Sequence, residues 1–423
     1  MLRFLRLHGV GPAHDLGPIN FSSRLNFITG DNGLGKSFLL DIAWWTLTRT
    51  WARDVEAMPN TSSSSFPAWI EYAYSKTTPG DVHEKSTFRR ESQTWPIKAG
   101  RPPIPGIVIY AGVDGSFSAW DPARNYWNDR DGMSGDRPRS FDFSPSQVWN
   151  GLASATGTRY CNGLIHDWVL WQRGSDPAFL SLTSVLDALS PSPHEHLTPG
   201  RPVRLGLDIK DQPSLQMPYG QDVALIHASA AMRRIVALAY LLVWTWREHQ
   251  LAAEKTGTAP AREIIFLLDE IECHLHPKWQ RQIVPALMRV MQALTSSNIP
   301  VQLIVATHSP LVLASVEPFF NVNTDAVFTL RLEDGQAMVE EEQWAKQGDV
   351  VNWLVSDAFG LNQARSLEAE RAIEAAEAFM RGDIAMLPSG LSTQESINRA
   401  LELALPGGDH FWPRWIVFSE TRA

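Results

Sequence analysis

Residues 30–37 read Gly-Asp-Asn-Gly-Leu-Gly-Lys-Ser. Their spacing matches G-x-x-x-x-G-K-[ST], a loop whose glycines allow successive backbone N–H groups to turn toward one anion. Lys36 would reach the β- and γ-phosphates of a nucleotide, and the hydroxyl of Ser37 would ligate Mg²⁺. The residues predicted to bind the nucleotide are Gly30, Asp31, Asn32, Gly33, Leu34, Gly35, Lys36, Ser37 and Phe38.

The sequence on either side of this loop supplies the context that such a loop requires. Residues 25–29 form a short apolar run that is typical of a strand, and from Lys36 onward apolar residues recur with helical spacing. The start of a helix adds its own partial positive charge to an anion site. The order strand, turn, helix therefore favours a phosphate loop over an ordinary glycine-rich turn.

Two adjacent acids supply the expected partner of this loop. Residues 267–270 read Leu-Leu-Asp-Glu, which places both acids at the carboxyl end of a buried strand, where open α/β sheets bind ligands. Asp269 would hold Mg²⁺ directly or through water, and Glu270 would orient and polarise the attacking water. If both acids lie on the strand, the pleat points them to opposite faces. A solvated acidic turn is the weaker alternative.

Three histidines lie shortly after predicted strands, as the two acids do. His308 comes directly after the apolar run 301–307, where it could contact a γ-phosphate, although a lone histidine is often only structural. His274 and His276 lie two residues apart, as two ligands of a metal site can. No cysteine or acid cluster at ligand spacing completes such a site, so we expect these histidines to lie in a loop near a dimer partner.

The apolar pattern also predicts the architecture. Helical spacing at 227–248, a strand at 264–268, a helix at 279–293, a strand at 301–307 and a helix from 310 imply a parallel sheet covered on both faces. Further helices are expected at 366–380 and from Ser392, where Glu395 completes a capping-box spacing. The predicted division is 1–56 and 220–330 as two parts of one α/β head, 57–219 as a loop-rich inserted subdomain, and 331–423 as an acidic, mainly helical region.

Composition excludes several classes of protein. Of 423 residues 44% are hydrophobic and 20% charged, and the longest apolar runs fall far below the roughly 18 residues of a membrane span. The sequence has only two cysteines, neither in a Cys-x-x-Cys pair, and its amino terminus is unlike a secretory signal, which fits the cytoplasm. The net charge of −9 resides in residues 321–423, which carry 8 basic and 17 acidic side chains, so a uniformly basic nucleic-acid binder is disfavoured.

Together the motifs resemble those of ABC-class P-loop ATPases of the SMC-like and OLD-like branch, over residues 30–37, 267–277 and 306–310. Similar heads occur in ATPase subunits of bacterial anti-phage systems such as Septu, PARIS and the retron-associated ATPases. The resemblance implies a P-loop NTPase fold that uses ATP and Mg²⁺. It assigns catalytic roles to Lys36 and Glu270, a switch role to His308, and a D-loop to 272–276.

The family's signature sequence matches best at 228–232, Ala-Ser-Ala-Ala-Met. By this resemblance Ser229 would contact the γ-phosphate of ATP held by a second protomer, while alanines and methionine replace the usual glycines and glutamine. The alternative is that Ser229 is only a helix N-cap. Gln147 is a weak candidate for the Q-loop glutamine.

The resemblance implies a Mg-dependent ATPase, possibly slow, in which ATP joins two heads into a homodimer or higher homo-oligomer. This ATP-driven dimerisation, which hydrolysis would reverse, would regulate a separately encoded effector, for instance a nuclease, in anti-phage defence. A DNA-repair or chromosome-maintenance ATPase that binds nucleic acid through Arg233 and Arg234, and a nucleotide-gated scaffold with little turnover, remain alternatives; a transporter subunit fits poorly. No membrane association is expected, and the acidic carboxyl-terminal region is the place to test for a protein partner.

Overall fold

The computed structural model describes residues 1–60, 67–75, 80–97, 106–125, 138–192, 194–207, 210–295 and 299–420. The chain divides into two compact units, residues 1–348 and residues 349–423, which are treated separately below. Among the described residues, no helix has both the length and the apolar character needed to cross a bilayer.

The first unit is built on a mixed sheet whose eight described strands run in the order β19-β18-β3-β17-β16-β6-β7-β8. They are β3 (Leu25–Gly30), β6 (Ile107–Ala111), β7 (Phe117–Trp120), β8 (Phe141–Phe143), β16 (Ile264–Asp269), β17 (Val301–Ala306), β18 (Asp325–Glu333) and β19 (Gln336–Glu341). The five central strands, from β18 to β6, are parallel, and the outer strands join antiparallel. The predicted α/β fold with a mainly parallel sheet is confirmed.

Strand register brings the predicted motifs to one edge of this sheet. Ala306 on β17 pairs with Asp269 on one side and with Ile28 on the other. The three strands therefore end almost level, and the segments that follow them meet at their carboxyl ends.

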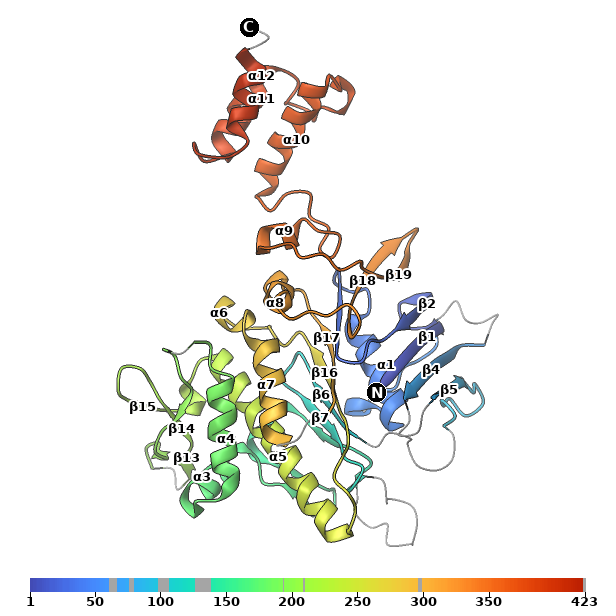
Figure 1. Cartoon of the computed structure of the whole chain (residues 1–423), viewed down its shortest axis with the longest axis vertical. Helices are drawn as coiled ribbons and strands as arrows, with labels where there is room; N and C mark the ends of the chain where they lie inside the picture. The colour runs from blue at the N-terminus through green and yellow to red at the C-terminus, as the bar shows by residue number, and fades with distance from the viewer. Residues whose placement is uncertain are drawn as a thin grey trace. The chain divides into compact units, whose positions relative to one another are not determined.

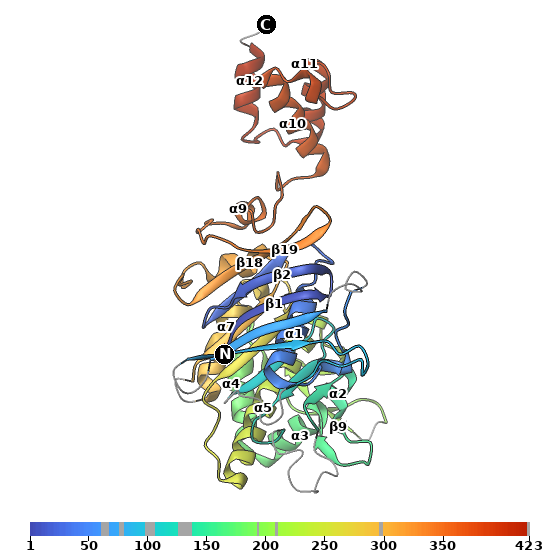
Figure 2. The ribbon, with the colours of Figure 1, turned by 90° about the vertical axis from the view of Figure 1, so that its right-hand side faces the viewer.

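The helix after β3, α1 (Lys36–Thr48), packs its apolar residues against one face of the sheet. The same core includes a four-stranded antiparallel sheet, ordered β2-β1-β4-β5, whose strands lie side by side in Figure 2. These strands are β1 (Leu2–Val10), β2 (Ala13–Asn20), β4 (Trp69–Ser75) and β5 (Asp81–Thr87). Trp44 and Trp45 on α1 are buried in this shared core, so these tryptophans are core residues.

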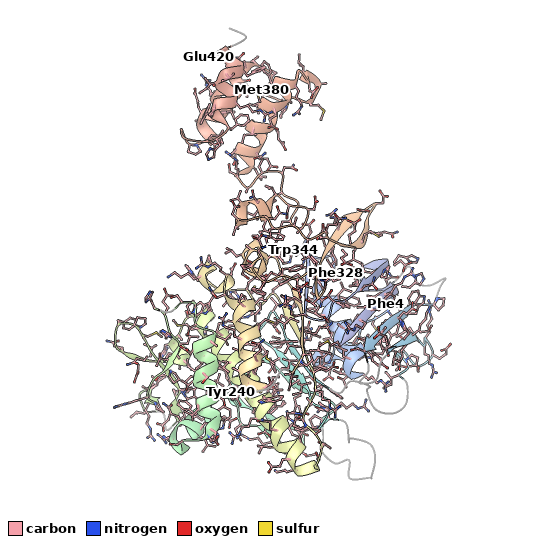
Figure 3. The ribbon with its side chains drawn as sticks, in the orientation of Figure 1. Phe4, Tyr240, Phe328, Trp344, Met380 and Glu420 are labelled. Atoms are coloured by element: carbon pink, nitrogen blue, oxygen red, sulfur yellow. The ribbon has the colours of Figure 1, made fainter. Side chains whose placement is uncertain are left out.

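Helices cover the opposite face of the central sheet from α1 (Figure 1). They are α2 (Pro145–Asn150), α3 (Leu164–Gly174), α4 (Pro177–Ala188), α5 (Ala230–Thr256), α6 (Pro277–Gln280), α7 (Ile283–Thr295) and α8 (Pro310–Val316). Tyr240 on α5 lies inside this helical layer (Figure 3) and donates to the Asp167 carboxylate on α3 at 2.7 Å. The same region of the chain also contains short strands that form small sheets of two or three strands. They are β9 (Leu152–Ala153), β10 (Arg159–Cys161), β11 (Thr198–Pro199), β12 (Val203–Arg204), β13 (Asp211–Gln212), β14 (Ser214–Gln216) and β15 (Asp222–Ala224).

The structure divides the chain differently from the sequence-based boundaries. The segment 57–219 does not form a compact unit, because its strands β4 and β5 join the antiparallel sheet and β6, β7 and β8 join the central sheet. The boundary at 330/331 cuts through β18, and residues up to 348 belong to the first unit. Backbone pairing over long sequence distances, which no local pattern reveals, sets these boundaries.

The second unit consists of the helices α9 (Val350–Leu354), α10 (Leu367–Arg381), α11 (Gln394–Ala404) and α12 (Trp412–Glu420). Helix α10 agrees with the predicted helix at 366–380. The predicted start of α11 at Ser392 is wrong, because Thr393 is the N-cap and exchanges capping hydrogen bonds with Ser396. Alanines of α10, together with Ile397, Leu401 and Trp415, form the core of this unit.

Candidate functional site

The phosphate loop follows β3 and leads directly into α1, as the motif predicts. Gly30, Gly33 and Gly35 all have positive φ, at 121°, 81° and 98°. A Cβ on Gly30 would lie 2.2 Å from the carbonyl oxygen of Leu330 on β18, whereas one on Gly33 would meet nothing within 4 Å. Glycine is therefore required at Gly30 by a neighbouring strand and at Gly33 by backbone conformation alone.

The side chain of Lys36 lies under this loop. Its Nζ donates to the carbonyl oxygens of Gly30 and Asp31, both at 2.8 Å, and the residue is only 5% exposed. Burial lowers the pKa of Lys36, while the nearby acids, Glu270 first among them, counteract that shift. A cation is thereby placed inside the loop, where the phosphates of a nucleotide would lie.

Ser37 and Asp269 face each other across the sheet edge. The Ser37 hydroxyl donates to Oδ1 of Asp269 at 3.0 Å, and Asp269 is 1% exposed. Burial is the main cause that raises the pKa of Asp269 to about 6. The described residues contain no cluster of three or more His, Cys, Asp or Glu side chains that could hold a metal. Two hard oxygen donors suit Mg²⁺, which completes its shell with water and substrate phosphates.

Glu270 lies outside the strand, contrary to the idea that the pleat separates the two acids. Strand β16 ends at Asp269, and Glu270 has a φ of 44°, a left-handed conformation that costs a non-glycine residue roughly 1–3 kcal/mol. Its N–H donates to the carbonyl oxygen of Ala306 at 3.0 Å. A tight backbone turn, and not the alternation of a strand, therefore sets the direction of the Glu270 carboxylate.

His308 stands next to this carboxylate. Its Nε2 lies 3.4 Å from Oε1 of Glu270, and both side chains are about one-third exposed, at 32% and 29%. Burial lowers the pKa of His308, and Lys36 lowers it further. The neutral ring is therefore favoured at pH 7, and its Nε2–H tautomer would point a donor at Glu270. The structure thus brings Lys36, Glu270 and His308 to one edge of the sheet.

Arg234 is a residue whose role the sequence did not reveal. Its Nη1 donates to the carbonyl oxygen of Val113 at 2.6 Å, and its Nη2 lies 3.1 Å from the carbonyl oxygen of Glu270. The same Nη2 is 3.4 Å and 3.5 Å from the carbonyls of Gly112 and Asp269. These contacts tie α5 to the turn after β6 and to the strained turn at Glu270. The observed contacts of Arg234 are all within the chain, so a place for it on a DNA surface stays a prediction.

Arg234→Ala should leave these carbonyls without their donor. Because unpaired buried polar groups cost about 1–3 kcal/mol, we expect a comparable loss in free energy of unfolding, measured by urea denaturation. We also expect ATP turnover to fall more than ATP affinity, since the turn at Glu270 loses a support. Arg233→Ala is the matched control, because Arg233 is the neighbouring arginine on the same helix and is exposed. Equal losses in both variants would contradict this role of Arg234.

Ser229 is the N-cap of α5. Its Oγ accepts a hydrogen bond from the N–H of Met232 at 3.3 Å, and the residue is exposed. The structure therefore confirms that Ser229 is an N-cap. An exposed helix start also leaves Ser229 accessible to a ligand from another molecule, so its signature role stays a prediction.

The remaining candidates serve local structure. Oε1 of Gln147 accepts from the N–H of Ser144 in a capping box at the start of α2, and the role of Gln147 as a Q-loop glutamine stays a prediction. Nδ1 of His276 accepts from the N–H of Lys278 and caps α6. His274 is exposed in the turn between β16 and α6, at a φ of 65°.

Comparison with known proteins finds similarity to ATPases over part of the chain. Residues 111–314, just under half of the chain, match the family model described as "AAA domain, putative AbiEii toxin, Type IV TA system". The chain is 50% identical over 52 residues to "Retron Vc95 probable ATPase" of Vibrio cholerae serotype O1 biovar El Tor, which covers 12% of this chain and 9% of that protein. The chain is similar to retron ATPases.

Two further relatives extend this similarity. "Retron Ec83 probable ATPase" of Escherichia coli is 33% identical over 99 residues, 23% of this chain and 15% of that protein. "Septu protein PtuA" of Bacillus thuringiensis is 26% identical over 145 residues, 30% of this chain and 33% of that protein. The predicted resemblance to retron-associated and Septu ATPases is confirmed, and the matched stretches span at most about a third of these curated relatives.

Among solved structures, the SMC head domain from Thermotoga maritima aligns with 81% of this chain and 99% of its own, at 14% identity and a TM-score of 0.40. An SmcHead bound to the C-winged helix domain of ScpA aligns with 82% of this chain and 98% of its own, at 14% identity and a TM-score of 0.43.

Proposed function

We propose that this chain is a Mg-dependent ATPase that hydrolyses ATP to ADP and phosphate. The observation that carries the proposal is that two pairs of side chains, Ser37 with Asp269 and Glu270 with His308, lie at the same edge of the sheet. Oγ of Ser37 lies 3.0 Å from Oδ1 of Asp269, and Nε2 of His308 lies 3.4 Å from Oε1 of Glu270. Both pairs are next to the phosphate loop, whose carbonyls accept from Lys36. The ATPase family of the relatives supports the same activity.

Each residue has a distinct task in this reaction. The backbone N–H groups of residues 31–35 and the Lys36 ammonium would bind the phosphates. Ser37 and Asp269 would hold Mg²⁺, which supplies charge neutralisation at the phosphates when bound. Glu270 would orient the attacking water and accept its proton as the new bond to the γ-phosphorus forms and the bond to the β–γ bridging oxygen breaks. His308 would hold the Glu270 carboxylate in place.

We further propose that two copies form a head-to-tail dimer around ATP. Support comes from Ser229, which is exposed at the start of the 27-residue helix α5, where N–H groups and the helix dipole favour an anion. Arg234 joins the same helix to the turn at Glu270. Nucleotide bound at the start of α5 would therefore influence the site of the chain that contributes α5.

Mixing two inactive variants tests this arrangement. Lys36→Ala removes a phosphate ligand, and Ser229→Arg blocks the start of α5. In a head-to-tail heterodimer one site receives both defects and the other receives neither, so phosphate release should recover on mixing. Each variant alone and wild type without Mg²⁺ are the controls. A wild-type chain that releases no phosphate with MgATP would overturn the ATPase proposal, and a mixture as inactive as its components would count against the dimer.

The biological role follows from the relatives and belongs to the same proposal. Similarity to retron ATPases and to PtuA supports a role in bacterial anti-phage defence, in the cytoplasm, with a separately encoded effector such as a nuclease as partner. The second unit carries charged, solvent-facing helices that could bind such a partner. Co-purification of an effector with wild type but not with a chain that ends at residue 348 would support this assignment.

A further inference from the structure

A buried carboxylate joins the turn after β16 to the turn after β17. Oε1 of Glu272 accepts from the Thr307 hydroxyl at 2.6 Å and from the N–H of His308 at 2.8 Å. Glu272 is only 7% exposed. One oxygen atom therefore fixes the backbone of the residue whose ring stands beside Glu270.

This contact holds a run of three residues. The Thr307 hydroxyl, while it donates to Glu272, also accepts from the N–H of Ser309 at 3.0 Å. A second hydrogen bond to the turn after β17 runs from the Ser309 hydroxyl to Oε1 of Gln280 on α6 at 2.8 Å, but it does not involve His308. Of the two ties, only the one through Glu272 acts on His308 directly.

Burial of the Glu272 carboxylate lowers the stability of the folded chain. The Thr307 hydroxyl and the His308 N–H are neutral donors, no ion pair with Glu272 occurs among the described residues, and its buried Oε2 has no hydrogen-bond partner there. Burial accordingly raises the pKa of Glu272. An incompletely satisfied buried acid is unfavourable for folding, and such departures from local stability concentrate at functional sites.

We propose that Glu272 is a positioning residue for the ATPase reaction: it fixes the His308 backbone so that the imidazole Nε2 stays at the Glu270 carboxylate. This inference rests on the proposed function and deepens it. It also joins the exposed turn that contains His274 to the reacting groups, since Glu272 and His274 belong to the same turn. A displacement of that turn would move His308.

Three variants test the proposal by phosphate release and by binding of a fluorescent ATP analogue. Glu272→Ala should lower kcat at least tenfold and change the Kd of the analogue less than twofold. Glu272→Gln keeps an acceptor oxygen and should retain kcat within about threefold. Gln280→Ala, which cuts the other tie, is the matched control and should also stay within threefold. Loss of analogue binding in Glu272→Ala, or an equal loss of turnover in Gln280→Ala, would overturn the proposal.

A double-mutant cycle separates positioning from general support of the fold. In the His308→Ala background, Glu272→Ala should have no further effect on kcat, because its partner in the reaction is gone. A further tenfold loss in that background would show that Glu272 acts elsewhere and would overturn the proposal.

The imidazole titration of His308 provides a readout that needs no turnover. The signal is assigned by its absence in His308→Ala, and its pKa is measured by NMR. Because burial and Lys36 lower the pKa of His308, release of the ring in Glu272→Ala should raise that pKa toward the ordinary value, and Glu272→Gln should restore it. An unchanged pKa in Glu272→Ala would overturn the proposal. If wild type proved inactive while this shift occurred, the ATPase proposal would fail and the positioning of His308 by Glu272 would stand.

Discussion

Glu270→Gln should reduce ATP turnover at least about 100-fold, in the range that removal of a general base produces. Glutamine has nearly the same shape and can keep the contact with His308, but it cannot accept a proton from the attacking water. Because Lys36, Ser37 and Asp269 are untouched, we expect affinity for MgATP to be retained. The measurement is steady-state phosphate release beside equilibrium binding of a labelled nucleotide.

A control distinguishes this chemical effect from loss of charge or of fold. Glu254→Gln changes an exposed acid near the end of α5, so its turnover should equal that of wild type. Melting temperatures of both variants should match that of wild type. A Glu270→Gln protein with half of the wild-type turnover would show that another group accepts the proton.

The candidate site was largely predictable from the sequence because its parts are local patterns at strand ends. The loop at 30–37, the two acids at the end of β16 and His308 after β17 each follow an apolar run. Parallel strands place such ends at one edge whatever the intervening chain does. The structure accordingly brings Ser37 to Asp269 and Glu270 to His308.

Other parts depended on contacts between segments that are far apart in the chain. Strand β6 resembles many short apolar runs, and only its pairing with β16 makes it part of the central sheet. The contacts of Arg234 span up to 122 residues, so its apolar helix gave no indication of them. The turn at Glu270 was missed because a positive φ is rare for glutamate and is imposed by neighbours.

Gly30→Ala and Gly33→Ala should differ in their effect on stability, although both glycines belong to the same loop and both have positive φ. Alanine at Gly33 meets open space, so only the backbone conformation is unfavourable, by about 1–2 kcal/mol. Alanine at Gly30 also has an unfavourable positive φ, at 121°, and in addition meets the Leu330 carbonyl at 2.2 Å.

That carbonyl belongs to β18, which pairs with β3 from Asp325 to Leu330, so relief of the clash requires the two strands to separate at the phosphate loop. We therefore expect Gly30→Ala to lose about 3 kcal/mol or more of unfolding free energy, the sum of strain and overpacking. Urea denaturation without nucleotide measures both variants on the same scale. Equal losses would mean that β18 yields easily at Leu330, and hence that conformation alone selects glycine at the start of the loop.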